Sequence, residues 1–576
     1  MPTSLGPWGY LPLALPIGVL LPQRLGARIA PRAGTVERLI LGAVVTCAAL
    51  TLGLRIAAQF GVLSPYLVLA QLSALWLAGT SRATLVEVRS PLVTPVLVVT
   101  GVALAVVACA AYLMPVWQWD SLGYHLPFVG FVLQDRNISG LPADVPYLAT
   151  YPHNIELLYL ALRMLLPDDR LIDLGQLPLG LLGALATAGI ARRLGAKVPV
   201  AIVAGLLWLT MPAVLLQLPT NYVDVGAAAY LLCTIYFLVG EATARDQLLA
   251  GIALGLYLGA KPSAPPGTVL CGLVLLWNAR RELRGITALA CLLVVLLGGE
   301  AYFTNLVRHH NPTWPVMIDV GPLHLPGVNS VTDLLSSGAG APHLTGRFRV
   351  LRSWLTLVPP PIFDMRIGGF GPPFLLALAP AALVLSRRWR SALPILVLAA
   401  FVAPDPAIAR YTLAFPGIVL ALASVWLSEA ARMERAGARR AGLALGAVAA
   451  FNVAVAWPGF PGEGPPLGSY FGLSWADREG AVGPDWQTAH LDAVRNELVA
   501  GDAAACDGSF EFPYLLWRPD LANRVRRITT PADRVSVLAD DSVRLLVLDD
   551  RLPPDPTRWR RRFHCETDSC VVYSRR

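Results

Sequence analysis

The sequence is poor in charge. Only 15% of its 576 residues are Asp, Glu, Lys or Arg, whereas 55% are hydrophobic. Soluble domains carry about a quarter charged residues, so this composition excludes an ordinary soluble protein of this length. Apolar runs of about 20 residues recur between residues 36 and 457, long enough to cross a bilayer as helices and too continuous for barrel strands. We therefore expect a polytopic all-α membrane protein.

Three other features are missing from the sequence. No Lys/Arg-rich block is interleaved with aromatic residues, so the net charge of +8 does not indicate a nucleic-acid partner. No positive charge precedes the apolar stretch at the N-terminus, as a signal peptide would require, so this stretch is expected to be interfacial or packed. No internal repeat or inverted symmetry is visible, although many transporters are built from such repeats.

The apolar runs predict thirteen transmembrane spans. They lie at 36–58, 63–80, 92–114, 170–190, 198–217, 222–241, 246–260, 264–277, 286–303, 371–386, 391–405, 410–430 and 441–457. With a cytoplasmic N-terminus, nearly every short basic cluster falls in a cytoplasmic loop, as the positive-inside rule requires. These clusters are Arg82 and Arg89; Arg192, Arg193 and Lys197; Arg280, Arg281 and Arg284; Arg387, Arg388 and Arg390; and Arg432, Arg435, Arg439 and Arg440.

Residues 247–277 allow two interpretations. They form either one broken helix or two short crossings that meet at "AKPSAPPG" (260–267). One broken helix would invert every later loop and turn three Arg clusters outward, so the charge bias favours two crossings. Lys261 would then lie below the outer surface, where a lysine either snorkels or lines a water-filled cavity with a partner.

This topology divides the chain into a transmembrane domain (1–457) and an extracytoplasmic domain (458–576). Two outer loops, 115–169 and 304–370, belong to the first domain. The outer face collects polar residues from distant segments: Asp120, Tyr124, His125, Tyr151, His153, Asn154, Glu156, Asn221, Asp224, Lys261, Arg410 and Tyr411. Asp120 and Tyr124 are four residues apart, so a short helix would present both on one side.

Each of these residues also has a structural explanation. Asp224 could cap a helix, Arg410 could anchor an interface, and His153 and Glu156 could be ordinary loop residues. Two acids and two cations on one face nevertheless suit a reaction: a carboxylate can take a proton from a hydroxyl or amine, and cations can stabilise a leaving phosphate. Because nucleotide sugars are absent outside the cytoplasm, a polyprenyl-phosphate sugar would be the donor.

Seven motifs carry a resemblance to a known family. They are "WDSLGYHLP" (119–127), "YPHNIELLYL" (151–160), "NYVDVGAAAY" (221–230), "LGAKPSA" (258–264), "TNLVRHHNPTWPV" (304–316), "GGFGPPF" (368–374) and "RYTLAFPGIVLAL" (410–422). In this order they resemble the GT-C superfamily of integral membrane glycosyltransferases. The similarity is greatest to bacterial relatives of protein mannosyltransferases and of the lipid A aminoarabinose transferase, and it covers roughly residues 92–430.

The resemblance implies a GT-C fold in the inner membrane and an inverting transfer of sugar from a polyprenyl phosphate to an extracytoplasmic acceptor. Asp120 matches the family's essential acid, which acts as general base or orients the acceptor. The second acid and acceptor side would be Asp224, Tyr124, His125 and Glu156. The donor phosphate would be bound by Lys261, Arg410, Tyr151, His153 and Arg308. His309 and His310 are further candidates for that role.

The sequence departs from the family at two points. Ser121 follows Asp120 where many relatives carry a second acid, and "TYPHN" (150–154) stands where many carry Lys before Pro-Pro. Some GT-C enzymes use a divalent cation and others do not. Asp120, Asp224 and His153 offer oxygen and nitrogen ligands, but no spacing signature fixes a metal.

The outward tail begins with a linker rich in Gly and Pro (458–485). The stretch 486–501 predicts a helix, and 502–519, 534–550 and 558–574 predict strands and turns of a small α/β domain. Outside the cytoplasm Cys565 and Cys570 can form a disulfide between two terminal strands; a metal pair is disfavoured because no second Cys/His pair has matching spacing.

Two other functions compete with the glycosyltransferase. A transporter or flippase of lipid-linked sugars would place ionisable residues near mid-membrane in both halves, whereas this chain gathers them on one face. An envelope-assembly protein without activity is compatible with the missing second acid after Asp120.

Overall fold

The structure, a computed structural model, describes twelve segments of the chain. These are residues 16–79, 90–143, 145–240, 242–279, 283–330, 348–357, 369–430, 435–461, 465–482, 491–551, 553–565 and 570–576. Five arginines used to orient the chain lie outside them: Arg82, Arg89, Arg280, Arg281 and Arg432.

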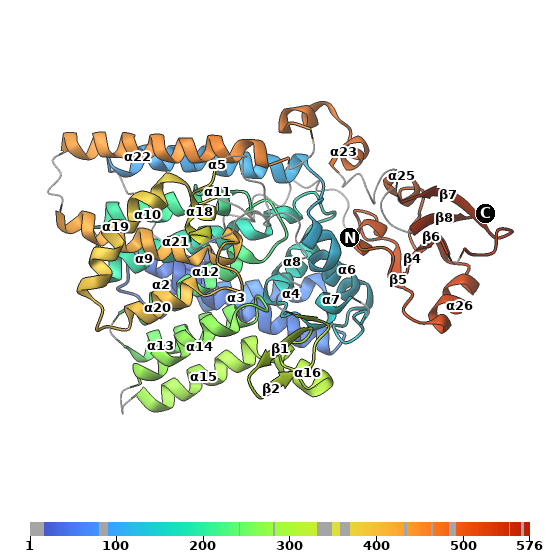
Figure 1. The fold of residues 1–576 in the computed structure, drawn as a ribbon, viewed down its shortest axis with the longest axis horizontal. Helices are drawn as coiled ribbons and strands as arrows, with labels where there is room; N and C mark the ends of the chain where they lie inside the picture. Colours follow the sequence, from blue (N-terminus) through green and yellow to red (C-terminus); the bar gives the residue numbers. More distant parts are fainter. Residues whose placement is uncertain are drawn as a thin grey trace.

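A bundle of helices makes up most of the molecule (Figure 1). Its longer helices are α2 (Leu21–Ile29), α3 (Thr35–Gln59), α4 (Pro65–Ala78), α5 (Val93–Leu113), α6 (Leu126–Asp135), α8 (Asn154–Leu165), α9 (Leu177–Arg193), α10 (Val198–Leu209), α12 (Asp224–Leu238), α13 (Ala244–Leu258), α14 (Pro265–Trp277), α15 (Arg284–Gly298), α16 (Glu300–His309), α19 (Gly371–Arg387), α20 (Leu393–Phe401), α21 (Ala414–Ala430) and α22 (Arg435–Ala456). Shorter pieces are α7 (Pro146–Thr150), α11 (Pro212–Leu215) and α18 (Arg349–Leu355). Each of the thirteen predicted spans overlaps a helix of this bundle.

Four helical segments in the described part of the chain are long and apolar enough to cross a membrane: Thr35–Gln59, Val93–Leu113, Ile172–Arg193 and Ala436–Gly459. The bent pair α15 and α16 would make a fifth, and six shorter apolar helices accompany them. Large apolar side chains on the outside of α14 and α15, such as Leu273 and Val295, are exposed. Such a surface suits lipid. The bundle is therefore that of an integral membrane protein, while the number of thirteen crossings stays a prediction.

The apolar N-terminal segment includes a packed helix. Helix α2 lies against α3 so closely that glycine is needed at both contacts: a Cβ on Gly26 would meet the backbone of Arg38, and one on Gly42 would meet that of Pro22. The described part of this segment is therefore packed in the bundle.

The predicted span 286–303 is not one straight helix. Helices α15 and α16 meet at an angle of 66°. Just before the bend, Gly298 lets α15 pack closely on α13, because a Cβ there would lie 2.4 Å from the carbonyl oxygen of Gly255. The Leu297 carbonyl at the bend accepts hydrogen bonds from Asn154 Nδ2 at 3.0 Å and from Arg55 at 3.3 Å. Polar side chains from α3 and α8 thus replace the hydrogen bonds that the bent helix loses.

Residues 247–277 form two helices, and whether these are two separate crossings stays a prediction. Helix α13 ends at Leu258, and α14 begins at Pro265. Proline suits the first position of a helix because the N–H that it lacks would have no hydrogen-bond partner within the helix there. The turn between them carries Lys261. Tyr302 Oη lies 3.1 Å from the carbonyl oxygens of both Leu258 and Lys261, which share its single proton, and this contact holds the turn against α16.

Basic loops gather at one end of the bundle. Arg388, after α19, donates to the carbonyl of Leu194, after α9, at 3.0 Å. The backbone N–H of Lys197 donates to Ser428, near the end of α21, at 2.9 Å. Arg193 pairs with Asp246, at the start of α13, at 3.1 Å. The other ends of α13 and α21 carry Lys261 and Arg410, so these cations lie at the opposite end. Which end faces the cytoplasm stays a prediction.

A small sheet region follows the bundle in sequence and lies beyond one end of it (Figure 1). Its strand order is β5-β4-β6-β8-β7. The strands are β4 (Ala503–Cys506), β5 (Arg524–Arg527), β6 (Val543–Asp549), β7 (Trp559–His564) and β8 (Cys570–Arg575). Strands β4, β5 and β6 run parallel, and β8 is antiparallel to both neighbours. A disulfide joins Cys565 to Cys570, with a Cα–Cα distance of 5.4 Å, where β7 and β8 meet.

Three local expectations differ from the structure. The stretch 534–550 begins with helix α26 (Pro531–Ala539) before β6, because Thr530 and Asp533 form a capping box. Of the helix predicted over 486–501, the described residues contain only α25 (Leu491–Arg495). The outer loop 304–370 contains strands β1 (Val316–Val320), β2 (Leu323–Leu325) and β3 (Asn329–Ser330), which the sequence did not predict.

The sheet region packs firmly on α6. The Trp517 indole lies edge-on to Phe131, with ring centroids 4.8 Å apart, and is 2% exposed. A Cβ on Gly130 would lie 2.8 Å from this indole, so glycine makes room for it. The side chain of Gln134 exchanges two hydrogen bonds with the backbone of Val525 in β5, at 2.7 and 3.1 Å.

This contact predicts a large loss of stability for Trp517→Ala. Removing a buried Trp costs about 3–5 kcal/mol because the cavity it leaves closes only in part. Thermal and denaturant unfolding of the purified protein would measure the loss, with Trp389→Ala as control because Trp389 is 64% exposed. Equal stability of the two variants would mean that the sheet region does not depend on α6.

Candidate active site at one end of the helix bundle

Asp120 stands at the start of the π-helical turn η3 (Ser121–His125), between α5 and α6. Such turns are rare and occur often at functional sites. The backbone N–H of Asp120 donates to the Tyr222 hydroxyl at 3.3 Å. On the other side, Trp119 packs edge-on against Phe512 of the sheet region, with centroids 5.9 Å apart. The turn is therefore held from the bundle and from the sheet region together.

One oxygen of the Asp120 carboxylate is held by Arg410. Arg410 Nη1 donates to Oδ2 at 2.9 Å. Arg410 comes from the short helix η6 (Ala409–Thr412) that precedes α21. Its side chain is 7% exposed and that of Asp120 is 16% exposed. Among the described residues, no hydrogen-bond donor meets Oδ1 of Asp120. That oxygen can therefore accept a proton from a hydroxyl or amine.

Asp224 continues this chain of charges. It is the first residue of α12, where the helix dipole favours a carboxylate. Lys261 donates to its Oδ1, and Arg410 Nη1 lies 3.7 Å from its Oδ2. The order of charges is thus Asp120, Arg410, Asp224, Lys261, drawn from four different segments. Two acids and two cations meet here, and the cluster is electrically balanced.

Aromatic rings flank both cations. The Arg410 guanidinium lies 5.0 Å from the ring centroid of Tyr222 and 5.1 Å from that of Tyr411. Lys261 Nζ lies 4.0 Å from the Tyr411 centroid. Cation–π contacts at such distances stabilise a charge that has lost much of its water.

The residues expected on the acceptor side separate into two groups. Tyr124 is close enough to Asp120 and Arg410 for their charges to act on its hydroxyl. Its ring forms an aromatic group with those of Tyr147 and Tyr151, at centroid distances of 5.7 and 5.9 Å. His125 and Glu156 instead pair with each other at 2.7 Å and are buried, with 4% and 3% of their side chains exposed. This pair ties η3 to α8, which suits a structural role. Their predicted contact with the acceptor stays a prediction.

Three residues expected to bind the donor phosphate share a separate cavity. A hollow of about 140 Å³ is lined by Tyr151, His153 and Arg308, together with Glu300 from α16. The lining of this hollow does not include Asp120, Asp224, Lys261 or Arg410. His153 stacks on Phe128 with centroids 4.0 Å apart. His153 and Arg308 therefore lie away from Lys261 and Arg410, whereas Tyr151 borders both the hollow and the aromatic group beside the charge cluster.

Burial shapes the chemistry of the loop residues. It raises the pKa of the Tyr124 hydroxyl well above its usual value, and the Asp120 carboxylate adds to this rise. Burial also raises the pKa of Tyr151. Both hydroxyls therefore stay protonated and can donate hydrogen bonds. Burial lowers the pKa of His153, so this ring is neutral near pH 7 and brings no positive charge to a phosphate.

The charge cluster does not fit a divalent cation. The described residues contain no group of three His, Cys, Asp or Glu side chains arranged to hold a metal. Asp120 and Asp224 are already bound by Arg410 and Lys261, whose charges occupy the place where a metal would sit. His153, the third candidate ligand, lines the hollow with Glu300 and Arg308 instead.

Tyr222 is the main residue that the sequence did not single out. Its hydroxyl contacts the Asp120 backbone, its ring flanks Arg410, and its carbonyl accepts a hydrogen bond from Tyr159. It is 2% exposed. The only sign of this role in the sequence was its position, since Tyr222 lies two residues before Asp224 inside the motif "NYVDVGAAAY".

The fold is that of solved GT-C glycosyltransferases. ArnT from Cupriavidus metallidurans in the apo state matches with a TM-score of 0.53 and 15% identity, over 83% of this chain and 97% of that chain. The same enzyme bound to undecaprenyl phosphate matches with a TM-score of 0.51 and 14% identity, over the same shares. An oligosaccharyltransferase from Archaeoglobus fulgidus gives 0.41 and 13%, over 79% of this chain and 70% of that chain, too distant for any argument. No family model and no curated protein sequence matches the chain.

Proposed function

We propose that the chain is a membrane glycosyltransferase that moves a sugar from a polyprenyl-phosphate donor to an extracytoplasmic acceptor. The observation that carries this proposal is the cluster of Asp120, Arg410, Asp224 and Lys261 at one end of an apolar bundle with a GT-C fold. A related fold binds undecaprenyl phosphate in ArnT, which supports a lipid-linked donor here. The inner membrane is the compartment that fits, with the cluster facing outward.

Asp120 is the general base in this proposal. Its Oδ1 accepts the proton of the acceptor hydroxyl or amine while the acceptor atom attacks the anomeric carbon of the sugar. The bond from that carbon to the phosphate oxygen breaks, and the polyprenyl phosphate leaves with the bonding electrons. Attack from the side opposite the leaving group inverts the anomeric centre.

Arg410 and Lys261 receive the charge that develops on the leaving phosphate. Each binds a carboxylate in the free protein, so both are held in place before the donor arrives. A planar guanidinium can bind a phosphate with two parallel hydrogen bonds, whereas a lysine acts as a compact point charge. As the phosphate becomes more negative during transfer, its attraction to both cations grows, and this difference lowers the barrier.

Donor recognition can be tested with undecaprenyl phosphate as probe. Native mass spectrometry of the full chain should show a bound lipid, and undecaprenol, which lacks the phosphate, should bind about tenfold or more weakly, as expected for loss of a charge-assisted contact. Lys261→Gln should weaken binding of undecaprenyl phosphate, whereas Lys197→Gln, at the other end of the bundle, should not. Equal binding of the two lipids would refute a phosphate-binding role for this cluster.

A further inference from the structure

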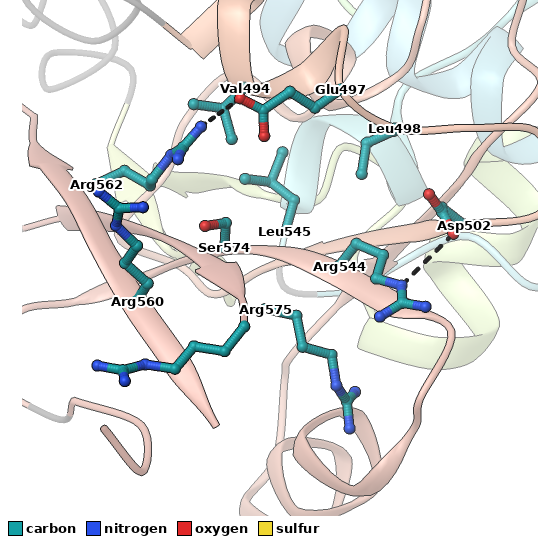
Figure 2. A pocket seen from close by; sticks show the side chains of 11 residues that line it. Val494, Glu497, Leu498, Asp502, Arg544, Leu545, Arg560, Arg562, Ser574 and Arg575 are labelled. Atoms are coloured by element: carbon teal, nitrogen blue, oxygen red, sulfur yellow. Dashed lines mark hydrogen bonds and ion pairs between the residues drawn. The ribbon is translucent and has the colours of Figure 1, made fainter. Parts of the chain in front are cut away.

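The sheet region carries a second concentration of positive charge, far in sequence from the charge cluster. A cavity of about 820 Å³ lies between α25 with its following loop and the strands β6, β8 and β7 (Figure 2). Its lining includes five arginines and two acids: Arg544, Arg560, Arg562, Arg575, Arg576, Glu497 and Asp502. We call this cavity the arginine groove. Arg575 is also paired with Asp541 outside the lining, and the remaining four arginines still outnumber the two acids of the groove.

The floor of the groove follows from strand register. Ser574 of β8 is paired with Leu545 of β6 on one side and with Arg560 of β7 on the other. Residues directly opposite each other in a sheet project to the same face. Leu545, Ser574 and Arg560 therefore form one row across three strands. A hydroxyl and a guanidinium in such a row both supply hydrogen-bond donors.

Ion pairs at the two sides hold further guanidinium groups in place. Figure 2 shows the Arg562–Glu497 pair and the Arg544–Asp502 pair on opposite sides, with Leu545 and Ser574 between them. The second pair is long, at 3.8 Å. Arg560 has no ion pair among the described residues. Glu497 and Asp502 thus hold two arginines in place, while Arg560 remains available to an anion. Arginines that are already held lose little conformational entropy when an anion binds.

We propose that the arginine groove binds a phosphate-class oxyanion. Planar guanidinium groups match tetrahedral phosphate oxygens with paired hydrogen bonds, and a cluster of them attracts such anions over long range. The groove uses β6, β8 and the edge strand β7, whereas the opposite edge strand β5 faces the bundle (Figure 1). The groove therefore lies toward the edge of the sheet opposite to β5. The identification of the groove's ligand as a phosphorylated acceptor rests on the proposed function. The binding of a phosphate-class oxyanion does not depend on it.

The probes are inorganic pyrophosphate and vesicles containing phosphatidylglycerol, each added to the full chain in phosphatidylcholine nanodiscs. The groove variant is Arg544→Gln with Arg560→Gln. The matched control is Arg551→Gln with Arg558→Gln, which removes two exposed arginines outside the groove. Titration calorimetry should show pyrophosphate binding about tenfold weaker in the groove variant and unchanged in the control.

The two probes separate the sources of the phosphate. If the groove variant loses pyrophosphate binding, the ligand of the groove is a soluble phosphate. If it loses only its co-flotation with the vesicles, the ligand is a lipid headgroup. If the groove variant and the control match the unmodified protein with both probes, the proposal is wrong. Sugar transfer is not needed for either measurement, so this result is independent of the proposed glycosyltransferase activity.

Discussion

Asp120→Asn should lower sugar transfer about 10²–10⁴-fold, the contribution typical of a positioned general base. The substitution keeps the size of the side chain and an oxygen that can accept a hydrogen bond from Arg410, but the amide cannot take a proton. Transfer from a polyprenyl-phosphate sugar, followed as release of undecaprenyl phosphate, would measure the loss. Binding of undecaprenyl phosphate should persist, because the cations remain.

Asp319→Asn provides the matched control. Asp319 lies on β1 in the outer loop, pairs with His324, and has 57% of its side chain exposed. Losing this carboxylate should leave transfer unchanged. If Asp120→Asn retained full activity while folding normally, another group would have to accept the proton, and the role given to Asp120 would be wrong.

Arg410→Gln should damage both stability and donor binding. Arg410 bridges Asp120 and Asp224, and its side chain is 7% exposed. Removing the shared cation leaves carboxylates with little water around them, which typically costs about 3–5 kcal/mol. Affinity for undecaprenyl phosphate should fall as well, because the same guanidinium binds the phosphate. Denaturant unfolding and lipid binding would measure the two effects separately.

Two further variants distinguish charge from geometry. Arg410→Lys keeps the charge and loses the planar fork, so it should recover part of the stability and less of the donor affinity. The double variant with Arg410→Gln and Asp120→Asn should lose less stability than the sum of the losses of the two single variants. Each substitution removes the partner that the other would leave unpaired. Additive losses of stability would show that Asp120 and Arg410 do not interact.

Much of the bundle could be predicted from hydropathy, and the GT-C fold from the order of the motifs. The convergence of Asp120, Asp224, Lys261 and Arg410 could be predicted because each lies near a helix end on the same side of the topology. Alternating helix direction then suffices to bring them to one face, without knowledge of side-chain packing.

The details of pairing could not be predicted in the same way. His125 and Glu156 pair where α6, which follows η3, packs on α8, and neither residue signals this in sequence. At the bend between α15 and α16, the Leu297 carbonyl accepts a hydrogen bond from Asn154 of another helix. Helix α26 had a sequence signal, the Thr530–Asp533 capping box, which the prediction of strands and turns over 534–550 did not use. Tertiary contacts decided the first two cases, and a local cap decided the third.

A structure of the full chain with undecaprenyl phosphate would test the central claim most directly. We expect the phosphate to lie within hydrogen-bond distance of Arg410 and Lys261, with Oδ1 of Asp120 facing the space where the sugar would be attached. A phosphate bound elsewhere on the bundle, with the ion pairs of Asp120 and Asp224 intact, would contradict the account.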